Sequence, residues 1–126
     1  MNSIIKGKSF NFALRIIRMY KYLTEIKKEY ILSRQLLKSG TSIGANVEEA
    51  LGGQSDKDFI SKISIAYKEA RETDYWIKLL KASGTINTDE YNSIIKDCRE
   101  IQKILSSILI TTKKKLKKDP PTNINS

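Results

Sequence analysis

A stretch of small residues lies within a helical repeat of apolar residues, between Ser39 and Ala50. The segment reads SGTSIGANVEEA, and its apolar side chains fall three or four positions apart, as on one face of an α-helix. Glycine inside a helix lets a neighbouring backbone come close, so we interpret Gly40 and Gly44 as points of close packing. A phosphate-binding loop would follow a strand, and no strand pattern precedes Gly40. The stretch therefore predicts a helix packed against other helices.

Four segments of the chain repeat apolar residues every three or four positions. Their predicted bounds are about 9–28, 30–51, 56–83 and 88–117. No segment alternates apolar and polar residues with a period of two, so strands are not expected. Because short connections make successive helices antiparallel, the pattern predicts an all-α, up-down-up-down four-helix bundle. The 126 residues suffice for one domain, placed at residues 1–119, and the polar tail 120–126 is expected to be disordered.

The predicted helix ends carry local signals. Ser55 and Asn87 each precede a helix and have an acidic residue three positions later, which is the spacing of a capping box. Gly52-Gly53 and Gly84 are predicted to end the second and third helices, because glycine adopts the left-handed conformation at little cost. The connection between the first two helices has neither glycine nor proline, so its position is the least defined.

The positive charge of the chain is distributed unevenly. The formal net charge is +9, and residues 1–28 hold seven basic residues and one acidic residue. Residues 29–81 hold eight of each sign, and residues 82–126 hold eight basic and five acidic residues. In the predicted bundle, the start of the first helix and the end of the fourth lie at one end, so we expect one basic edge. Its predicted members are Lys6, Lys8, Arg15, Arg18, Lys21, Lys113, Lys114, Lys115, Lys117 and Lys118.

A concentrated basic edge predicts binding to RNA or DNA. Each phosphate neutralised by Lys or Arg releases condensed counterions, so such binding depends on salt and little on base sequence. The sequence contains no recognition-helix, zinc-finger or RNA-recognition motif. Two alternatives stay open. The lysines could keep a helix end soluble and complement its dipole, or the edge could meet an acidic protein or a membrane surface.

The composition argues against an enzyme. The chain has no histidine, which removes the commonest general base and a common metal ligand. No nucleotide-binding glycine motif is present, and the lone Cys98 has no histidine to activate it. We therefore expect no catalytic residue, no metal site and no cofactor.

The remaining composition indicates the compartment. Cys98 lies on an apolar helical stripe, which is typical of a small buried residue in a reducing environment. No stretch approaches the ~20 apolar residues that span a bilayer, and the N-terminus lacks the apolar region of a signal peptide. We expect a cytoplasmic protein with no membrane partner.

Polar residues beside the predicted core form a second candidate cluster. Its members are Asn46 and Glu49 on the second helix and Glu69, Glu72 and Thr73 on the third. Small residues on both helices would bring these groups together, and we interpret them as a hydrogen-bonded network that fixes helix pairing and register. Contact with a ligand or a partner is the alternative.

Several apolar residues on the third and fourth helices do not fit the core stripes. They are Ile65, Tyr75, Leu79, Ile104 and Ile110. Together they suggest a second apolar face, and a bundle with two such faces tends to self-associate. We expect a homo-oligomer. A broad stripe within a monomer is the alternative.

Two segments resemble a known family. Residues 35–39 with 42–50, which read QLLKS and SIGANVEEA, and residues 65–76, which read IAYKEARETDYW, resemble the bacterial four-helix-bundle family of 23S rRNA-intervening sequence proteins. The accessory variability determinant of diversity-generating retroelements is similar. The likeness covers about residues 9–112. It implies a bundle that assembles as a homopentameric ring with a basic surface and binds nucleic acid. In the retroelement branch it also implies association with a reverse transcriptase.

Overall fold

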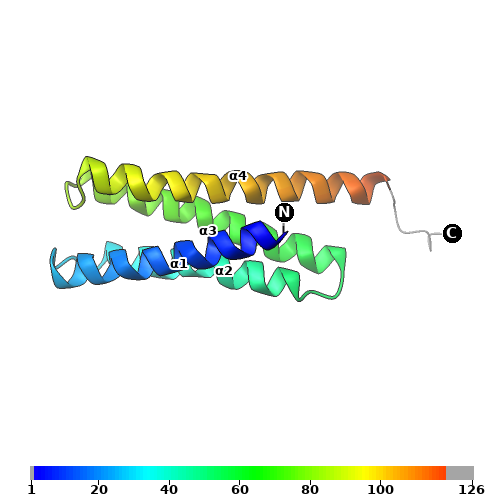
Figure 1. Ribbon diagram of the computed structural model, residues 1–126, viewed down its shortest axis with the longest axis horizontal. Coiled ribbons are helices and arrows are strands. Elements are labelled where there is room, and N and C mark those ends of the chain that lie inside the picture. The colour runs from blue at the N-terminus through cyan, green and yellow to red at the C-terminus, as the bar shows by residue number, and fades with distance from the viewer. Residues whose placement is uncertain (1, 119–126) are drawn as a thin grey trace.

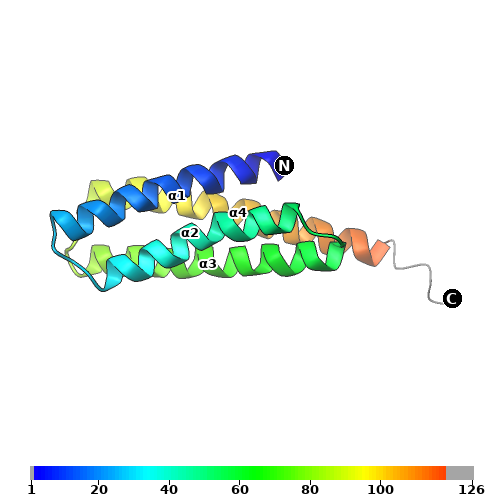
Figure 2. The same ribbon diagram turned by 90° about the horizontal axis from the view of Figure 1, so that it is seen from below.

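The structure, a computed structural model, describes residues 2–118. They form four α-helices, with the bounds α1 Asn2–Glu25, α2 Leu32–Leu51, α3 Asp56–Ala82 and α4 Thr88–Lys118. Successive helices run antiparallel and lie side by side (Figure 1; Figure 2). The all-α, up-down-up-down bundle predicted from the apolar repeats is thus confirmed. The predicted tail at 120–126 lies outside the described residues.

The first helix begins earlier than predicted, at Asn2 instead of about residue 9. Ile5 and Ser9 precede Phe12 at helical spacing, and all three side chains are buried, so the core stripe continues toward the N-terminus. The helix ends at Glu25 instead of residue 28. Ile26, three residues after the buried Leu23, lies past this end and is 67% exposed.

The connection between α1 and α2 is closed by a carboxylate. Glu29 accepts hydrogen bonds from the backbone N–H groups of Ile31, Leu32 and Ser33, at 3.1, 3.0 and 2.7 Å. These three N–H groups lie at the start of α2 and have no hydrogen-bond partners within the helix. Lys28, the residue before Glu29, takes the left-handed conformation with φ 58°. The cap places the start of α2 at Leu32 instead of residue 30.

The other helix ends confirm most of the predicted signals. Ser55 Oγ accepts from the backbone N–H of Asp58 at 3.1 Å, and Asn87 and Glu90 cap each other reciprocally at 2.8 Å. Gly84 has φ 78°, as predicted for the residue after α3.

The prediction for Gly52-Gly53 is wrong in its conformation. The helix ends there, but Gly52 has φ −91° and ψ 4°, and Gly84 is the one glycine with positive φ within residues 2–118. The N–H of Gly52 still bonds the carbonyl oxygen of Glu48, and that of Gly53 bonds the carbonyl oxygen of Ala50. The last turn therefore closes on itself without a left-handed residue.

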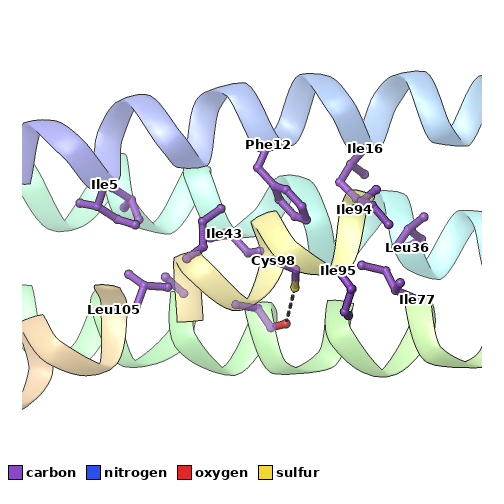
Figure 3. Packing of buried hydrophobic residues seen from close by; sticks show 14 of the residues in the cluster. Ile5, Phe12, Ile16, Leu36, Ile43, Ile77, Ile94, Ile95, Cys98 and Leu105 are labelled. Atoms are coloured by element: carbon purple, nitrogen blue, oxygen red, sulfur yellow. Dashed lines mark hydrogen bonds between the residues drawn. The ribbon is translucent and has the colours of Figure 1, made fainter. Parts of the chain in front are cut away.

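The small residues of α2 pack against α1. A Cβ atom at Gly40 would lie 2.7 Å from the side chain of Ile16, and one at Gly44 would lie 3.3 Å from the carbonyl oxygen of Ser9. The close packing inferred for both glycines is confirmed. Around this contact, aliphatic side chains from all four helices form the core (Figure 3).

The helices do not pack equally along the bundle. α1 and α4 approach each other over much less of their length than the three pairs that follow each other in sequence. The C-terminal turns of α4 also extend past the start of α1 (Figure 1; Figure 2). Within residues 2–118 no helix has the length and apolar character needed to cross a membrane.

Candidate nucleic-acid interface

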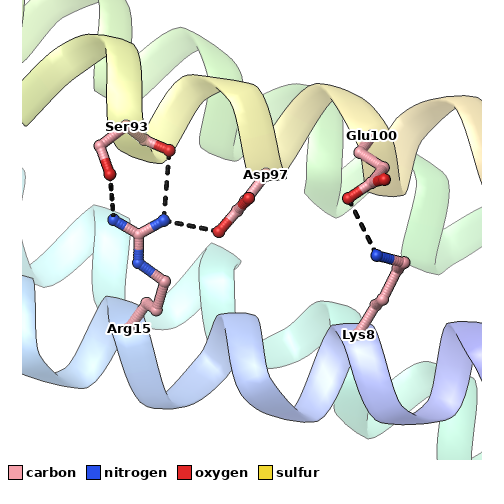
Figure 4. Close-up of polar contacts among 5 residues, drawn as sticks. All are labelled: Lys8, Arg15, Ser93, Asp97 and Glu100. Atoms are coloured by element: carbon pink, nitrogen blue, oxygen red, sulfur yellow. Dashed lines mark hydrogen bonds and ion pairs between the residues drawn. The ribbon is translucent and has the colours of Figure 1, made fainter.

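The basic residues of α1 mostly face acidic residues of neighbouring helices. Arg15 donates to the carboxylate of Asp97, to Ser93 Oγ at 2.8 Å and to the carbonyl oxygen of Ser93 at 3.2 Å (Figure 4). Lys8 Nζ lies 3.1 Å from Glu100 Oε1 in the same seam (Figure 4). These contacts join α1 to α4 by charge, between two helices whose backbones approach each other less than the other neighbouring pairs.

The remaining predicted cations of α1 are less constrained. Lys6 Nζ lies 3.9 Å from Glu48 Oε1 on α2. Arg18 and Lys21 are exposed, and neither forms an ion pair within the described part of the chain. Three of the five predicted α1 cations are therefore paired with acids.

The lysines at the end of α4 have a different setting. Lys113, Lys114, Lys115, Lys117 and Lys118 are exposed and form no ion pair among residues 2–118. The contacts of Arg15 lie 16 to 20 residues earlier on α4, which corresponds to roughly 24–30 Å along the helix. The structure therefore does not bring Arg15 and these lysines together. We call Lys113–Lys118 the lysine end.

The predicted polar network between α2 and α3 is replaced by separate contacts. The hydroxyl groups of Thr73 and Ser39 are hydrogen-bonded at 2.8 Å and buried. Glu49 Oε1 instead pairs with Lys62 Nζ at 2.9 Å, and Asn46 donates to the carbonyl oxygen of Ser42 within its own helix. The antiparallel register explains the separation, since Ser39–Thr73 and Glu49–Lys62 lie about three turns apart.

Glu69 and Glu72 add an unfavourable interaction to this seam. Burial and the neighbouring charge of Glu72 raise the pKa of Glu69. Thr73 Oγ1 lies 2.8 Å from the backbone carbonyl oxygen of Glu69, so the contact of Glu69 with Thr73 is made by its main chain. Neither carboxylate thus belongs to the network that sequence spacing suggested.

Sequence reasoning missed the main polar contact between α3 and α4. Asp74 Oδ2 accepts from Arg99 Nε at 3.0 Å and from Gln102 Nε2 at 2.8 Å, and Oδ1 lies 3.6 Å from Lys78 Nζ. The Asp74 side chain is 13% exposed. Burial alone would raise the pKa of Asp74, but the hydrogen bonds from Arg99 and Gln102 outweigh it and lower that pKa.

Cys98 lies beside this contact, on the core side of α4. Its Sγ donates to the carbonyl oxygen of Ala70 at 3.4 Å (Figure 3). Burial is the main cause that raises the pKa of the Cys98 thiol to about 12. No group of three or more Cys, Asp or Glu side chains within residues 2–118 is placed to hold a metal ion.

The apolar residues outside the core divide into two sets. Of those predicted on α3 and α4, Ile65, Tyr75 and Ile110 are 38, 52 and 54% exposed, while Leu79 and Ile104 are half-buried. A set that sequence reasoning missed lies on α1. Phe10, Leu14 and Ile17 are 61, 40 and 36% exposed, and their spacing places them on one face.

Comparison with known proteins confirms the resemblance to the 23S rRNA-intervening sequence proteins, but not the similarity to the accessory variability determinant. The sequence matches the family described as "23S rRNA-intervening sequence protein" over residues 1–107. A solved protein of unknown function from the S23 ribosomal protein family, from Bacteroides thetaiotaomicron VPI-5482, is 49% identical. The similarity covers 86% of this chain and 96% of that chain, with a TM-score of 0.85. No curated protein matches the sequence. The chain belongs to the 23S rRNA-intervening sequence protein family.

Proposed function

We propose that this protein is a non-enzymatic accessory protein that binds nucleic acid through the lysine end of α4. The observation that carries the proposal is the cluster of five exposed lysines within six residues, with no acid among them. The cluster projects past the start of α1, where a long polyanion can approach it (Figure 1). The family match stops at residue 107, so the proposal rests on the charges of this chain and not on the family name.

The lysine end contains more cations than a helix terminus needs. Cations complement the helix dipole only within the last turn, and Lys113 and Lys114 precede that turn. Unpaired cations attract phosphates and displace condensed counterions, which gives a slope of about −0.9 in log affinity against log salt for each phosphate neutralised on a duplex. If all five lysines contact phosphates, the slope contributed by the lysine end is about −4.5.

The test compares two variants that each lose three positive charges. In the first, Lys113, Lys114 and Lys117 are replaced by Gln. In the second, Lys6, Lys8 and Arg15 are replaced by Gln. We expect the first to weaken binding to all duplex sequences alike and to reduce the magnitude of the salt slope by about 2.7. The second should leave the slope nearly unchanged, because its cations already face acids.

Two results would contradict the proposal. If the natural protein binds neither RNA nor DNA at low salt, the lysines only keep the helix end soluble. If the two variants lose the same slope, net charge and not the lysine end determines binding.

The proposal extends to assembly and to a protein partner. The family resemblance supports a homo-oligomer and suggests a pentamer. Light scattering of the purified protein gives its mass, and a monomer at micromolar concentration would contradict this part. Association with a reverse transcriptase rests on the resemblance alone. It is tested by co-purification with a reverse transcriptase encoded beside the gene.

The alternative is a protein–protein scaffold with no role in nucleic-acid binding. The exposed apolar face of α1, at Phe10, Leu14 and Ile17, favours this alternative. A scaffold would bind its partner at high salt and would keep that binding when the lysine end is neutralised. The same charge variants therefore separate the two functions.

A further inference from the structure

The seam between α3 and α4 contains a groove that the proposed function does not use. Two adjoining shallow hollows of about 590 and 630 Å³ share the walls formed by Tyr67, Asp74, Arg99 and Gln102. Both volumes fall in the range of about 300–1,000 Å³ that is typical of ligand sites. We call these two hollows the α3–α4 groove.

The α3–α4 groove has an excess of cations. Five cations line it, Lys68, Arg71, Lys78, Arg99 and Lys103, against the two acids Glu72 and Asp74. Asp74 pairs with Arg99 and Lys78. The other three cations, Lys68, Arg71 and Lys103, form no ion pair among residues 2–118, so they can bind an anionic ligand.

Helical spacing connects the groove with the lysine end. Steps of four and three residues lead along one face of α4 through Arg99, Lys103, Ser106, Ile110, Lys113 and Lys117. The first four of these residues line the groove, and the last two belong to the lysine end. This face runs 18 residues, or roughly 27 Å, which is long enough for several nucleotides of an extended strand.

Two tyrosines give the groove an aromatic wall. Tyr67 lines both hollows, and Tyr75 lines one of them. The Tyr75 side chain is among the more exposed aromatics, and its ring meets Trp76 edge-on, with centroids 5.2 Å apart and an interplanar angle of 63°. This contact orients the ring and leaves a face for a ligand. Tyrosine rings beside cations are the elements with which proteins bind unpaired bases.

We infer that the α3–α4 groove binds a single strand of nucleic acid, with phosphates on Lys68, Arg71 and Lys103 and bases against Tyr67 and Tyr75. The inference rests on the proposed function and adds the form of the ligand. A duplex keeps its bases stacked inside, so it cannot use the tyrosines. A second copy of this chain is a poorer occupant, because two grooves with the same excess of positive charge repel each other.

The test uses two exposed tyrosines as a matched pair. Tyr75→Leu changes the groove, whereas Tyr30→Leu changes a ring of nearly equal exposure, 53 against 52%, in the connection between α1 and α2. The probes are oligothymidylate, oligouridylate and a mixed-sequence DNA duplex. We expect Tyr75→Leu to weaken binding of the single strands about tenfold or more. Duplex affinity and the salt slope should stay at the natural values, and Tyr30→Leu should change neither.

Charge variants provide a second measurement if Tyr75→Leu disturbs the fold. Lys103→Gln lies in the groove and Arg34→Gln lies on the exposed side of α2, and neither cation has an ion pair within residues 2–118. Lys103→Gln should reduce the single-strand salt slope by about 0.7, and Arg34→Gln should leave it unchanged. The thymidylate and uridylate arms show whether the strand is DNA, RNA or either.

The outcomes separate this inference from the proposed function. If Tyr75→Leu and Tyr30→Leu bind single strands equally while the lysine-end variant loses affinity, the groove inference fails and the proposed function stands. If the natural protein binds no probe at low salt, both fail. If Tyr75→Leu lowers the mass in solution and leaves strand binding intact, the groove is a protein interface and the inference fails.

Discussion

α4 contacts its two neighbours in different ways. On the α1 side, cations of α1 meet acids of α4, as in Arg15–Asp97 and Lys8–Glu100, and the two helix backbones approach each other less than those of α3 and α4. On the α3 side, the mostly buried Asp74 side chain is surrounded by three donors and lies next to a well-packed core. The cations left over on that side are exposed. The number of cations on a helix therefore does not determine how many can bind a ligand, because acids of a neighbouring helix pair with some of them.

The acids in the two seams provide the sharpest test of this difference. Asp74→Asn removes a charge that receives two hydrogen bonds in a mostly buried position, and we expect a loss of about 2 kcal/mol in the free energy of unfolding. Asp97→Asn removes a partly exposed ion-pair partner and should cost under about 1 kcal/mol. Urea denaturation measures both. Equal losses in the free energy of unfolding would contradict the difference between the two sides of α4.

Acid should weaken the α3 side of α4 through the same residue. The pKa of Asp74 is lowered, so its contribution to stability is complete above the unfolded pKa of about 4 and is lost as pH falls through the folded pKa. Glu29 acts in the same direction at the start of α2, where burial raises its pKa but hydrogen bonds from the Leu32 and Ser33 amides outweigh that effect. We expect Asp74→Asn to lose less stability than the natural protein between about pH 6 and pH 3. Urea midpoints at both pH values measure this, and parallel losses would be the contrary result.

On its other side, α1 packs closely against α2, and this contact can be tested in the same way. Gly40→Ala places a Cβ atom 2.7 Å from the Ile16 side chain, and we expect a net loss of about 1 kcal/mol after the gain in helix propensity. Gly7→Ala is the matched control, since no atom beyond its own stretch of helix lies within 4 Å of its Cβ position, and it should gain up to about 1 kcal/mol. Thermal unfolding of both variants measures the difference. A gain at Gly40 would show that Ile16 moves freely.

The smallest effect is expected from the exposed pair in the α1–α4 seam. Lys8→Gln removes the contact with Glu100, and both side chains are substantially exposed, at 42 and 52%. We expect a loss of at most about 0.5 kcal/mol, and that loss should shrink in 1 M salt. Urea denaturation at two salt concentrations measures it. A loss that persists at high salt would mean that the lysine stem packs against α1 or α4.

The sequence predicted the fold because the apolar repeats, the caps at Ser55 and Asn87 and the turn at Gly84 all depend on neighbouring residues. The Glu29 cap was missed because a glutamate bonding the amides two to four residues ahead has no strong local pattern. The pairing of Arg15 with Asp97 and the contacts of Asp74 depend on the register between helices. Apolar spacing determines which faces meet but leaves their offset along the axis open.

The candidate site was predicted less completely for the same reason. The lysine end could be recognised because its five cations are consecutive or nearly so. Whether Lys8 and Arg15 join it depends on the position of Glu100 and Asp97 across the seam, which sequence spacing within α1 does not give. The polar cluster failed similarly, since Asn46 bonds within its own helix and the Glu49–Lys62 pair lies about three turns from the Ser39–Thr73 contact.

Alkylation of the buried Cys98 thiol reports how often the core between α3 and α4 opens. The thiolate is the form that reacts with alkylating reagents, and a pKa of about 12 leaves almost none of it at neutral pH while α3 and α4 are closed. Because the chain has one cysteine, the added mass of the reagent counts molecules that have opened. The rate of alkylation therefore measures how often this part of the core is exposed to solvent, and no probe has to be introduced into the protein.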